Sequence, residues 1–448
     1  MIAVQIAAII FLCLYIPSLM RVTIFVALFW LLAAISATVL FLRKGSLETK
    51  CVWFVIICAL PVAGALIFFL ASRRDKPHGI LKIRPKTQTE ESARLPYAVS
   101  YDNAQYFKTG TEFLSSALEN INAAKKSVYI EFFIFSRGHV FNTLIKALET
   151  AKANGADIKI ITDGVGSAFK INRKDVKRLK AAGAEVKIFH RLTPVPHARI
   201  NYRDHRKILV IDGKCAYTGG VNIGDEYANI SSPYGYWKDN GVVVFGKAAQ
   251  VFEGMFLAMW NGIYEMDAPE TGNKSCVPFF DSPPYEYFCE DAYVHAVSSA
   301  QKRVHILTPY FCVSEKTAAA LSFAARRGVE IKVIIPHIPD KPYAFEVSKA
   351  FASELAKYGV EFYEFDPGFM HAKALICDNT VFLGSYNFDF RSMHFNYECG
   401  VMFNDAITDE VERDFQECLT ISRKFSDKKP NFFKRLYRSF LRFFAPLI

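Results

Sequence analysis

The sequence contains no Cys-x-x-Cys pair, although ten cysteines are spread over its 448 residues. Zinc sites normally contain closely spaced cysteine pairs, and disulfide frameworks belong to small secreted chains. Three of the ten, Cys13, Cys51 and Cys58, lie in apolar runs near the N-terminus. We therefore expect reduced, packed thiols in a cytosol-facing protein.

Charged residues are absent from three stretches of the first 71 positions, namely 1–20, 22–42 and 51–71. As helices, the last two would each be about 31 Å long, enough to cross a hydrocarbon core of about 30 Å. This pattern argues against a wholly soluble protein. It predicts a transmembrane region over residues 1–71 with two or three spans.

The first apolar run has three interpretations. It can be a span joined to the next by a turn at Pro17–Ser18, a segment lying in the membrane interface, or a signal peptide. A basic start and a convincing small-residue cleavage site are both missing, which disfavours the signal peptide.

Basic residues predict the orientation in the membrane. Six Lys and Arg residues lie between 73 and 86, against three between 43 and 50. By the positive-inside rule, this places the rest of the chain on the cytoplasmic side of a multi-pass protein of the cell (inner or plasma) membrane. The net charge of +10 suits an anionic membrane surface and nucleic acid equally.

The chain beyond a polar linker at 72–98 repeats itself. The matching pairs of segments are 126–135 with 302–311, 154–161 with 327–334, and 179–183 with 355–359. Apolar strand runs alternate with helical segments, which is typical of an α/β sheet covered by helices. We predict two pseudo-twofold α/β/α sandwich domains at 99–272 and 273–425, with a longer loop in the first near residues 191–198.

An H-x-K-x₄-D pattern occurs once in each copy. His205 and Lys207 form the first pair, and His371 and Lys373 form the second. In a strand, positions two apart face the same side, so each histidine and its lysine would face one pocket. An imidazole and an ammonium group there can act on a phosphate as nucleophile or proton donor and as a charge partner.

The remaining residues of the pattern are two aspartates and two asparagines. Asp212 and Asp378 complete the motifs but fall on the opposite strand face, so we expect them to hold the following turn. Asn222 and Asn387 follow after glycines at matched distances. Their amides are predicted to bind the same phosphate.

These motifs and the segments around them resemble the phospholipase D superfamily and, within it, the bacterial cardiolipin synthases. The residues that carry the resemblance are Asn201-Tyr-Arg-Asp-His-Arg-Lys207, Gly219-Gly-Val-Asn-Ile-Gly-Asp-Glu-Tyr227, Thr308-Pro-Tyr-Phe311, and Gly384-Ser-Tyr-Asn-Phe-Asp-Phe-Arg-Ser392 with Asn396 and Glu398. The apolar run at 51–64 also resembles the membrane hairpin of that family. The resemblance covers nearly the whole chain.

The resemblance implies a reversible phosphatidyl transfer between two phosphatidylglycerol molecules, giving cardiolipin and glycerol. His205 would be the nucleophile that carries a phosphohistidine, and His371 the proton donor. Asp239 is the candidate to orient His205, and Glu398 the candidate to orient His371. No metal or other cofactor is expected.

Three functions remain open at this stage. The first is phosphatidyl transfer between anionic phospholipids of the bilayer. The second is a phospholipase D-type hydrolase or nuclease, or a transphosphatidylase with a different donor or acceptor, and the third is a membrane scaffold. The apolar runs disfavour nucleic acid as a partner, and the complete motifs in both copies disfavour the scaffold.

The last segment, 426–448, has the pattern of an amphipathic helix. Its apolar positions share one face, and its basic positions share the other. The apolar set is Phe433, Leu436, Tyr437, Phe440, Leu441 and Phe444, and the basic set is Lys434, Arg435, Arg438 and Arg442. This favours an interfacial helix, with a terminal helix packed on its own domain as the alternative.

Overall fold

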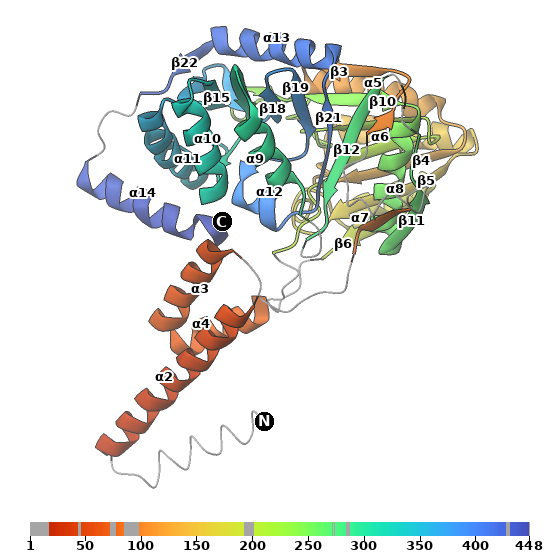
Figure 1. Cartoon of the computed structure of the whole chain (residues 1–448). Coiled ribbons are helices and arrows are strands. Elements are labelled where there is room, and N and C mark those ends of the chain that lie inside the picture. The colour runs from red at the N-terminus through yellow and green to blue at the C-terminus, as the bar shows by residue number, and fades with distance from the viewer. Residues whose placement is uncertain are drawn as a thin grey trace. The chain divides into compact units, whose positions relative to one another are not determined.

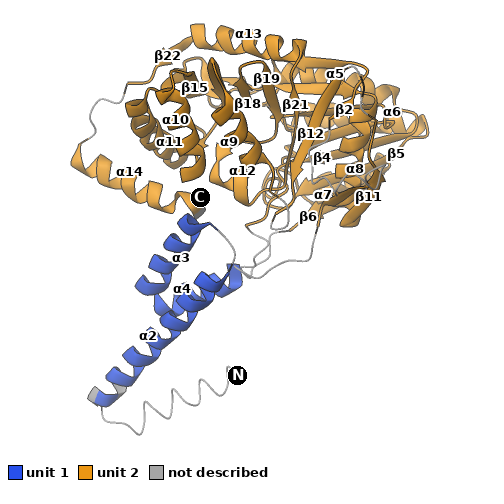
Figure 2. Cartoon of the chain, viewed as in Figure 1, with its two compact units in different colours: residues 1–75, 193–198, 447 blue, residues 76–192, 199–446, 448 orange. Residues whose placement is uncertain are grey.

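The structure is a computed structural model that describes residues 18–43, 46–71, 78–84, 98–191, 201–270, 272, 274–283, 287–426 and 431–447. It divides into two compact units (Figure 2). The N-terminal unit comprises residues 1–75, 193–198 and 447, and the larger unit comprises 76–192, 199–446 and 448.

The N-terminal unit contains helices α2 (Ser18–Leu42), α3 (Leu47–Ala59) and α4 (Pro61–Ala71) (Figure 1). Within the described residues, only Val22–Leu42 of α2 is a helix long and apolar enough to cross a membrane. Residues 1–17 and most of the basic positions used to predict orientation lie outside the described part.

The expected span over residues 51–71 is a misprediction, because the structure divides it between α3 and α4. Pro61 begins α4, and a proline interrupts a continuous helix since it has no N–H and its ring clashes with the preceding turn. Helices of 13 and 11 residues are about 20 and 17 Å long, shorter than a hydrocarbon core. Within the described residues, the prediction of several spans is therefore corrected to one candidate span, whereas most of the run at 1–20 lies outside them.

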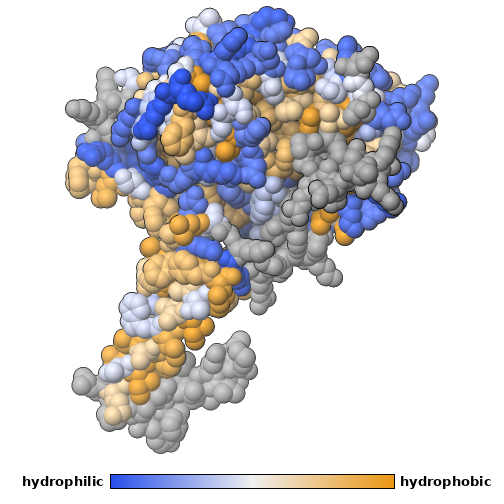
Figure 3. Space-filling model, in the orientation of Figure 1, coloured by the Kyte–Doolittle hydropathy of each residue, from blue (hydrophilic) through white to orange (hydrophobic). Residues whose placement is uncertain are grey.

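The three helices share a small core formed by Ala33, Leu40, Ile57 and Phe68. Many other large apolar side chains remain exposed, among them Trp30 and Leu31 at 57% and 56%. Figure 3 shows this unit as largely hydrophobic on its visible surface. An apolar surface of this kind marks a protein or membrane contact.

The larger unit contains two equivalent sheets, whose strand orders are β3-β10-β8-β7-β4-β5-β6 and β2-β12-β21-β19-β18-β13-β15-β16-β22. The first consists of β3 (Ala104–Phe107), β4 (Ser127–Phe132), β5 (Asp157–Asp163), β6 (Ala184–Phe189), β7 (Lys207–Ile211), β8 (Cys215–Gly219) and β10 (Gly241–Phe245). The second consists of β2 (Val99–Ser100), β12 (Ser275–Asp281), β13 (Arg303–Leu307), β15 (Glu330–Pro336), β16 (Glu361–Phe365), β18 (Ala374–Cys377), β19 (Thr380–Gly384), β21 (Glu398–Phe403) and β22 (Ser422–Lys424).

The two sheets match strand for strand at their centres. Strands β4, β5 and β6 are parallel and β7 is antiparallel to β4, just as β13, β15 and β16 are parallel and β18 is antiparallel to β13. This equivalence confirms the predicted pair of α/β halves.

Helices flank both sheets (Figure 1). Their bounds are α5 (Gly110–Ala123), α6 (His139–Ala153), α7 (Arg173–Ala181), α8 (Lys247–Asn261), α9 (Cys289–Ser299), α10 (Glu315–Arg326), α11 (Pro342–Leu355), α12 (Phe390–His394), α13 (Ala406–Thr420) and α14 (Phe432–Phe444). One buried cluster joins Val210 and Phe252 of the first half to Ile376 and Phe415 of the second. The halves therefore share a core.

Short strand pairs complete the unit. Strand β1 (Ile80–Arg84) pairs in parallel with β11 (Ile263–Asp267), so this part of the predicted linker at 72–98 forms a strand. The reason is an apolar alternation that buries Leu81, while Lys82 and Arg84 bond to Glu265. Strand β9 (Tyr236–Lys238) pairs with β17 (Gly368–Met370), and β14 (Phe311–Cys312) pairs with β20 (Phe388–Asp389).

Candidate active site

Each motif histidine lies against the backbone of the other half. The amide of His205, just before β7, donates to the carbonyl of Tyr397 at 2.9 Å. The amide of His371, just after β17, donates to the carbonyl of Lys238 at 2.7 Å. The two halves are thus joined at the two histidines.

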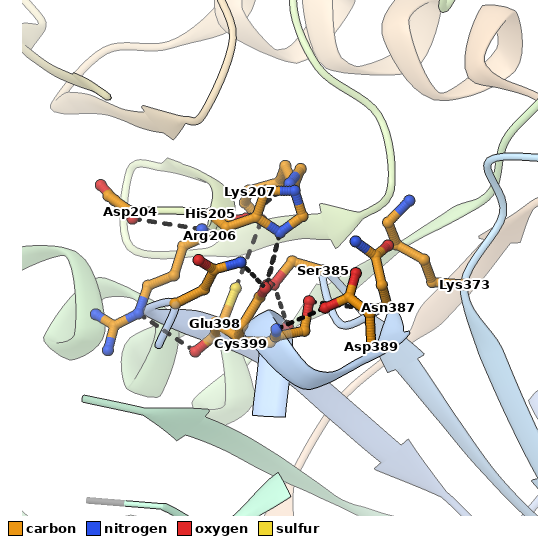
Figure 4. A network of polar contacts seen from close by, with 12 residues as sticks. Asp204, His205, Arg206, Lys207, Lys373, Ser385, Asn387, Asp389, Glu398 and Cys399 are labelled. Atoms are coloured by element: carbon orange, nitrogen blue, oxygen red, sulfur yellow. Dashed lines mark hydrogen bonds and ion pairs between the residues drawn. The ribbon is translucent and has the colours of Figure 1, made fainter. Parts of the chain in front are cut away.

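The carboxylates that orient the histidines also cross between the halves. Nδ1 of His205 lies 2.8 Å from Oε1 of Glu398, as Figure 4 shows, and Nδ1 of His371 lies 2.7 Å from Oδ2 of Asp239. The predicted assignment of these two carboxylates was therefore reversed. The physical reason is the backbone pairing, because each carboxylate comes one residue after the carbonyl that binds the other half's histidine.

The two lysines are buried behind the histidines. Nζ of Lys207 donates to the carbonyl of His205 at 2.7 Å, and Nζ of Lys373 donates to the carbonyl of His371 at 2.5 Å. Burial lowers the pKa of Lys207 to about 7 and that of Lys373 to about 8. A phosphate group beside them would favour their charged forms.

The lysines of both motifs influence the pKa of each histidine. Burial lowers the pKa of His205 well below its usual value, and the charges of Lys207 and Lys373 lower it further. Burial and Lys373, with a smaller contribution from Lys207, lower the pKa of His371 to about 3. Both imidazoles are therefore neutral. With the Nδ1 proton directed at a carboxylate, each Nε2 carries the lone pair.

The two orienting carboxylates differ in charge. Burial raises the pKa of Glu398 to about 7, against the opposing effects of Lys207, Ser385 and Asn396. Burial also raises the pKa of Asp239, but the contact with His371 and the nearby charges outweigh it, so the pKa lies below its ordinary value. Asp239 is ionised at neutral pH, whereas Glu398 titrates near it. The two histidines are thus electrostatically unequal.

The two motif aspartates lie at the far ends of their strands. The carboxylate of Asp212 accepts from the backbone amides of Lys126 and Ser127 at 2.7 and 3.0 Å, and Asp378 accepts in the same way from Arg303 at 3.0 Å. Each aspartate therefore clamps the turn after its strand to the start of β4 or β13. They are distant from the lysines in register, as the alternation predicted.

The two asparagines differ in their surroundings. Asn222 accepts from the amide of Ile134 at 3.1 Å and donates to the hydroxyl of Tyr227 at 3.0 Å. Oδ1 of Asn387 is buried without a hydrogen-bond partner in the described part of the chain. Asn387 lines a cavity of about 150 Å³ beside His205, so it is the asparagine with a side chain available to a ligand.

Five further charged or amide residues of this cavity were missed by the sequence interpretation as site residues: Arg203, Lys341, Asp389, Arg391 and Asn396. The charge of Lys341 also lowers the pKa of His205. Arg391 lies within the segment Gly384–Ser392, which carries the family resemblance, so the sequence could have identified it as a site residue. Lys341 precedes α11 in a segment with no motif.

The described residues contain no group of three or more His, Cys, Asp or Glu side chains placed to hold a metal ion. The histidines lie near the ammonium groups of two lysines and the carboxylates of Glu398 and Asp239, and the cavity beside His205 adds Arg203, Lys341 and Arg391 against the single carboxylate of Asp389. This set suits an anionic ligand.

Sequence comparisons match both halves to one family. The model of a family described as "Cardiolipin synthase, PLD-like domain" matches residues 117–260 and 293–419. An uncharacterized protein of Streptococcus mutans is 31% identical, over 92% of this chain and 99% of that protein. A cardiolipin synthase of Clostridium perfringens is 29% identical, over 91% of this chain and 96% of that protein.

A comparison with solved structures finds the same fold. The crystal structure of a phosphatidylserine synthase from Haemophilus influenzae superimposes with a TM-score of 0.59 at 14% identity, covering 79% of this chain and 96% of that one. At this identity the likeness concerns the fold alone. Given the family match over both halves and the end-to-end relatives, the chain belongs to the cardiolipin synthase family of phospholipase D-like phosphatidyltransferases.

Proposed function

We propose that this protein is a cardiolipin synthase that transfers a phosphatidyl group from one phosphatidylglycerol to a second. The observation that carries the proposal is the pair of histidines, each held at Nδ1 by a buried carboxylate at 2.8 or 2.7 Å. Because Nδ1 is held in this way, the Nε2 atom of each histidine can act on the phosphorus atom or its leaving group. Lys207 and Lys373 can stabilise the negative charge of the phosphoryl oxygens.

In the first half-reaction, Nε2 of His205 attacks phosphorus and a phosphoramidate bond forms. The bond from phosphorus to the glycerol oxygen breaks, and His371 supplies the proton that makes glycerol a neutral leaving group. The phosphodiester anion raises the low pKa of His371 when it binds, because negative charge favours the imidazolium form. Asp239 stabilises the same protonated state.

In the second half-reaction, a hydroxyl of the second phosphatidylglycerol attacks the phosphohistidine. His371, now neutral, accepts the hydroxyl proton, and the bond between phosphorus and Nε2 of His205 breaks. The product is cardiolipin, and both histidines return to their starting states. Every step is reversible, so excess glycerol drives the reaction backwards.

The membrane location supports phospholipid substrates over nucleic acid. The candidate span Val22–Leu42 would hold the protein in the cell membrane, where phosphatidylglycerol is available. We place the larger unit on the cytoplasmic side, on the count of basic residues between 73 and 86.

The test is an assay of the purified full-length protein with isotopically distinct phosphatidylglycerols, analysed by mass spectrometry. Cardiolipin that carries one labelled and one unlabelled phosphatidyl group, with release of free glycerol, is the expected product. Phosphatidic acid as the main product would indicate a hydrolase instead. Product only with added phosphatidylethanolamine or another alcohol would change the donor or the acceptor.

A further inference from the structure

The C-terminal helix α14 directs its charges toward the protein. Arg438 is only 6% exposed, and its Nε donates to Oε2 of Glu346 on α11 at 2.8 Å. Lys434 lies 3.5 Å from the same carboxylate, and Arg442 pairs with Glu354 near the other end of α11. Three of the four cations of α14 are therefore paired with glutamates of α11, and Arg438 is the buried one of the three.

The opposite side of α14 is aromatic and faces outward. The exposed side chains are Phe432, Phe433, Leu436, Tyr437, Phe440 and Phe443, between 40% and 77% accessible. Figure 3 shows hydrophobic atoms gathered on this helix at the lower left of the larger unit. A helix packed on a soluble protein has the reverse arrangement, with its apolar side inward.

A single apolar row attaches the helix to the core. Leu441 and Ala445 are 8% and 4% exposed and join the buried cluster of the second half. Leu441 therefore lies on the protein side, whereas the sequence pattern placed it with the outward aromatics. The alternative of a terminal helix packed on its own domain agrees with these contacts, and the interfacial interpretation stays a prediction for the apolar face that remains exposed.

The end of α14 also reaches the cavity beside His205. Ala445 lines that cavity together with Tyr343 and Val347 of α11. The lining combines apolar residues of α11 and α14 with polar ones such as His205, Asn387 and Lys341. A cavity with both polar and apolar lining can accept a phospholipid, whose phosphate and acyl chains differ in the same way.

We propose that α14 docks on an anionic lipid bilayer through its aromatic side, so that the cavity beside His205 opens at the lipid surface. The helix carries four basic and no acidic residues, and Arg435 is exposed with no ion-pair partner among the described residues. Outward aromatics with a basic residue suit the headgroup layer of anionic lipids. A second copy fits less well, because two such faces would bring their exposed Arg435 side chains together without a counter-charge. The link to catalysis rests on the proposed phospholipid substrate.

Contact with the bilayer is tested without any enzymatic step. Full-length Phe433→Trp protein is reconstituted into vesicles of phosphatidylglycerol that carries bromine on its acyl chains, and tryptophan fluorescence is compared with wild type. The matched control is Phe323→Trp, because Phe323 is an aromatic residue of α10 that is 62% exposed. Bromine should quench the added fluorescence at 433 and leave that at 323 unchanged. Equal fluorescence with and without bromine at 433 would overturn the proposal, and a blue shift without quenching would assign the face to a second copy.

The consequence for turnover is tested with charged variants. Phe433→Asp and Phe440→Asp should each lower the ratio of the rate on phosphatidylglycerol vesicles to the rate on dispersed short-chain phosphatidylglycerol by about tenfold, since each replaces an exposed aromatic that the lipid would cover with a charge. Phe323→Asp should leave the ratio unchanged. An unchanged ratio in the α14 variants would contradict the proposal. Failure of wild type to form cardiolipin on either substrate would instead contradict the proposed function and leave the quenching result valid.

Discussion

Nδ1 of His205 lies 2.8 Å from Oε1 of Glu398, although the two residues are 193 positions apart in the chain. Asp239 is related to His371 in the same way, at 2.7 Å and over 132 positions. Each half of the protein therefore supplies the carboxylate that sets the tautomer of the other half's histidine. Removal of one carboxylate should disable the histidine of the opposite half.

Glu398→Gln should slow formation of the covalent adduct on His205 by about 10²-fold or more, because the amide no longer holds the Nδ1 proton in place. Asp239→Asn should affect mainly the proton transfers of His371. Rapid-quench measurement with a p-nitrophenyl phosphate ester of a lipid separates the two, since that leaving group needs no proton. A larger loss of adduct in Asp239→Asn would show that the carboxylates act on the histidines of their own halves.

His205→Ala and His371→Ala should each abolish cardiolipin formation, but they should differ in what they trap. His371→Ala retains the nucleophile and should accumulate labelled phosphatidyl on His205 from the p-nitrophenyl ester. His205→Ala should accumulate none. Intact-protein mass spectrometry gives the readout, and an adduct on His205→Ala alone would reverse the roles of nucleophile and proton donor.

Binding of a phosphodiester should weaken as the pH rises above neutrality. The pKa values of Lys207 and Lys373 are lowered to about 7 and about 8, so both ammonium groups lose their protons as the pH rises through this window. Neutral amines attract a phosphate anion less strongly, and the dissociation constant should increase with pH. Equilibrium dialysis of short-chain phosphatidylglycerol with the His205→Ala protein measures it. Lys207→Met should bind more weakly at pH 6 and lose the step near pH 7, and an unchanged profile would contradict this assignment.

Asp212→Asn should lower stability rather than chemistry. The carboxylate accepts from three successive backbone amides, and an amide side chain should cost about 1–2 kcal/mol there. Although burial raises the pKa of Asp212, these bonds outweigh it and lower the pKa. The stabilisation is thus present above the unfolded pKa near 3.9 and is lost as the pH falls through the folded value.

Thermal unfolding in detergent at pH 7 and pH 3 measures this effect. The melting temperature of wild type should exceed that of Asp212→Asn at pH 7, and the difference should shrink at pH 3. The matched control is Lys207→Ala, which should lose about 10²-fold in rate. A comparable loss of rate in folded Asp212→Asn would place this aspartate in the chemistry after all.

The protein should remain in the membrane fraction after carbonate washing, because Val22–Leu42 is a helix of 21 residues with an apolar surface. Leu31→Lys, at the middle of this stretch, should weaken the anchorage, since a lysine at the centre of a span costs about 2.5–3.5 kcal/mol. Immunoblots of pellet and supernatant give the answer. Release of the wild-type protein by carbonate would contradict the assignment of α2 as a span.

The sequence predicted what depends on local repetition. The H-x-K pairs, the alternation of strands and helices and the second copy of each follow from spacing alone, and the structure confirms the two α/β halves. The contacts of Glu398 with His205 and of Asp239 with His371 could not be derived in this way. These contacts depend on hydrogen bonds between the halves, such as that from His205 to Tyr397. Residue spacing along the chain does not predict such bonds.

Two further differences between prediction and structure concern residues 51–71 and the orientation of α14. Hydropathy treats residues 51–71 as one run, but Pro61 divides the run between two helices. The periodicity of α14 identifies an apolar side and a basic side without stating which one meets the protein. Glu346 and Glu354 decide this question, and they lie on α11, about ninety residues earlier in the chain.

The exchange of carboxylates binds the two copies of the repeat into a single functional unit. A chain cut between β11 and β12 would give two fragments, one carrying His205 and Asp239 and the other His371 and Glu398. Neither fragment could orient its own imidazole, because the carboxylate that does so comes from the opposite half. A substitution that changes the surroundings of one histidine can therefore lie in the opposite repeat. The two repeats are constrained to evolve together.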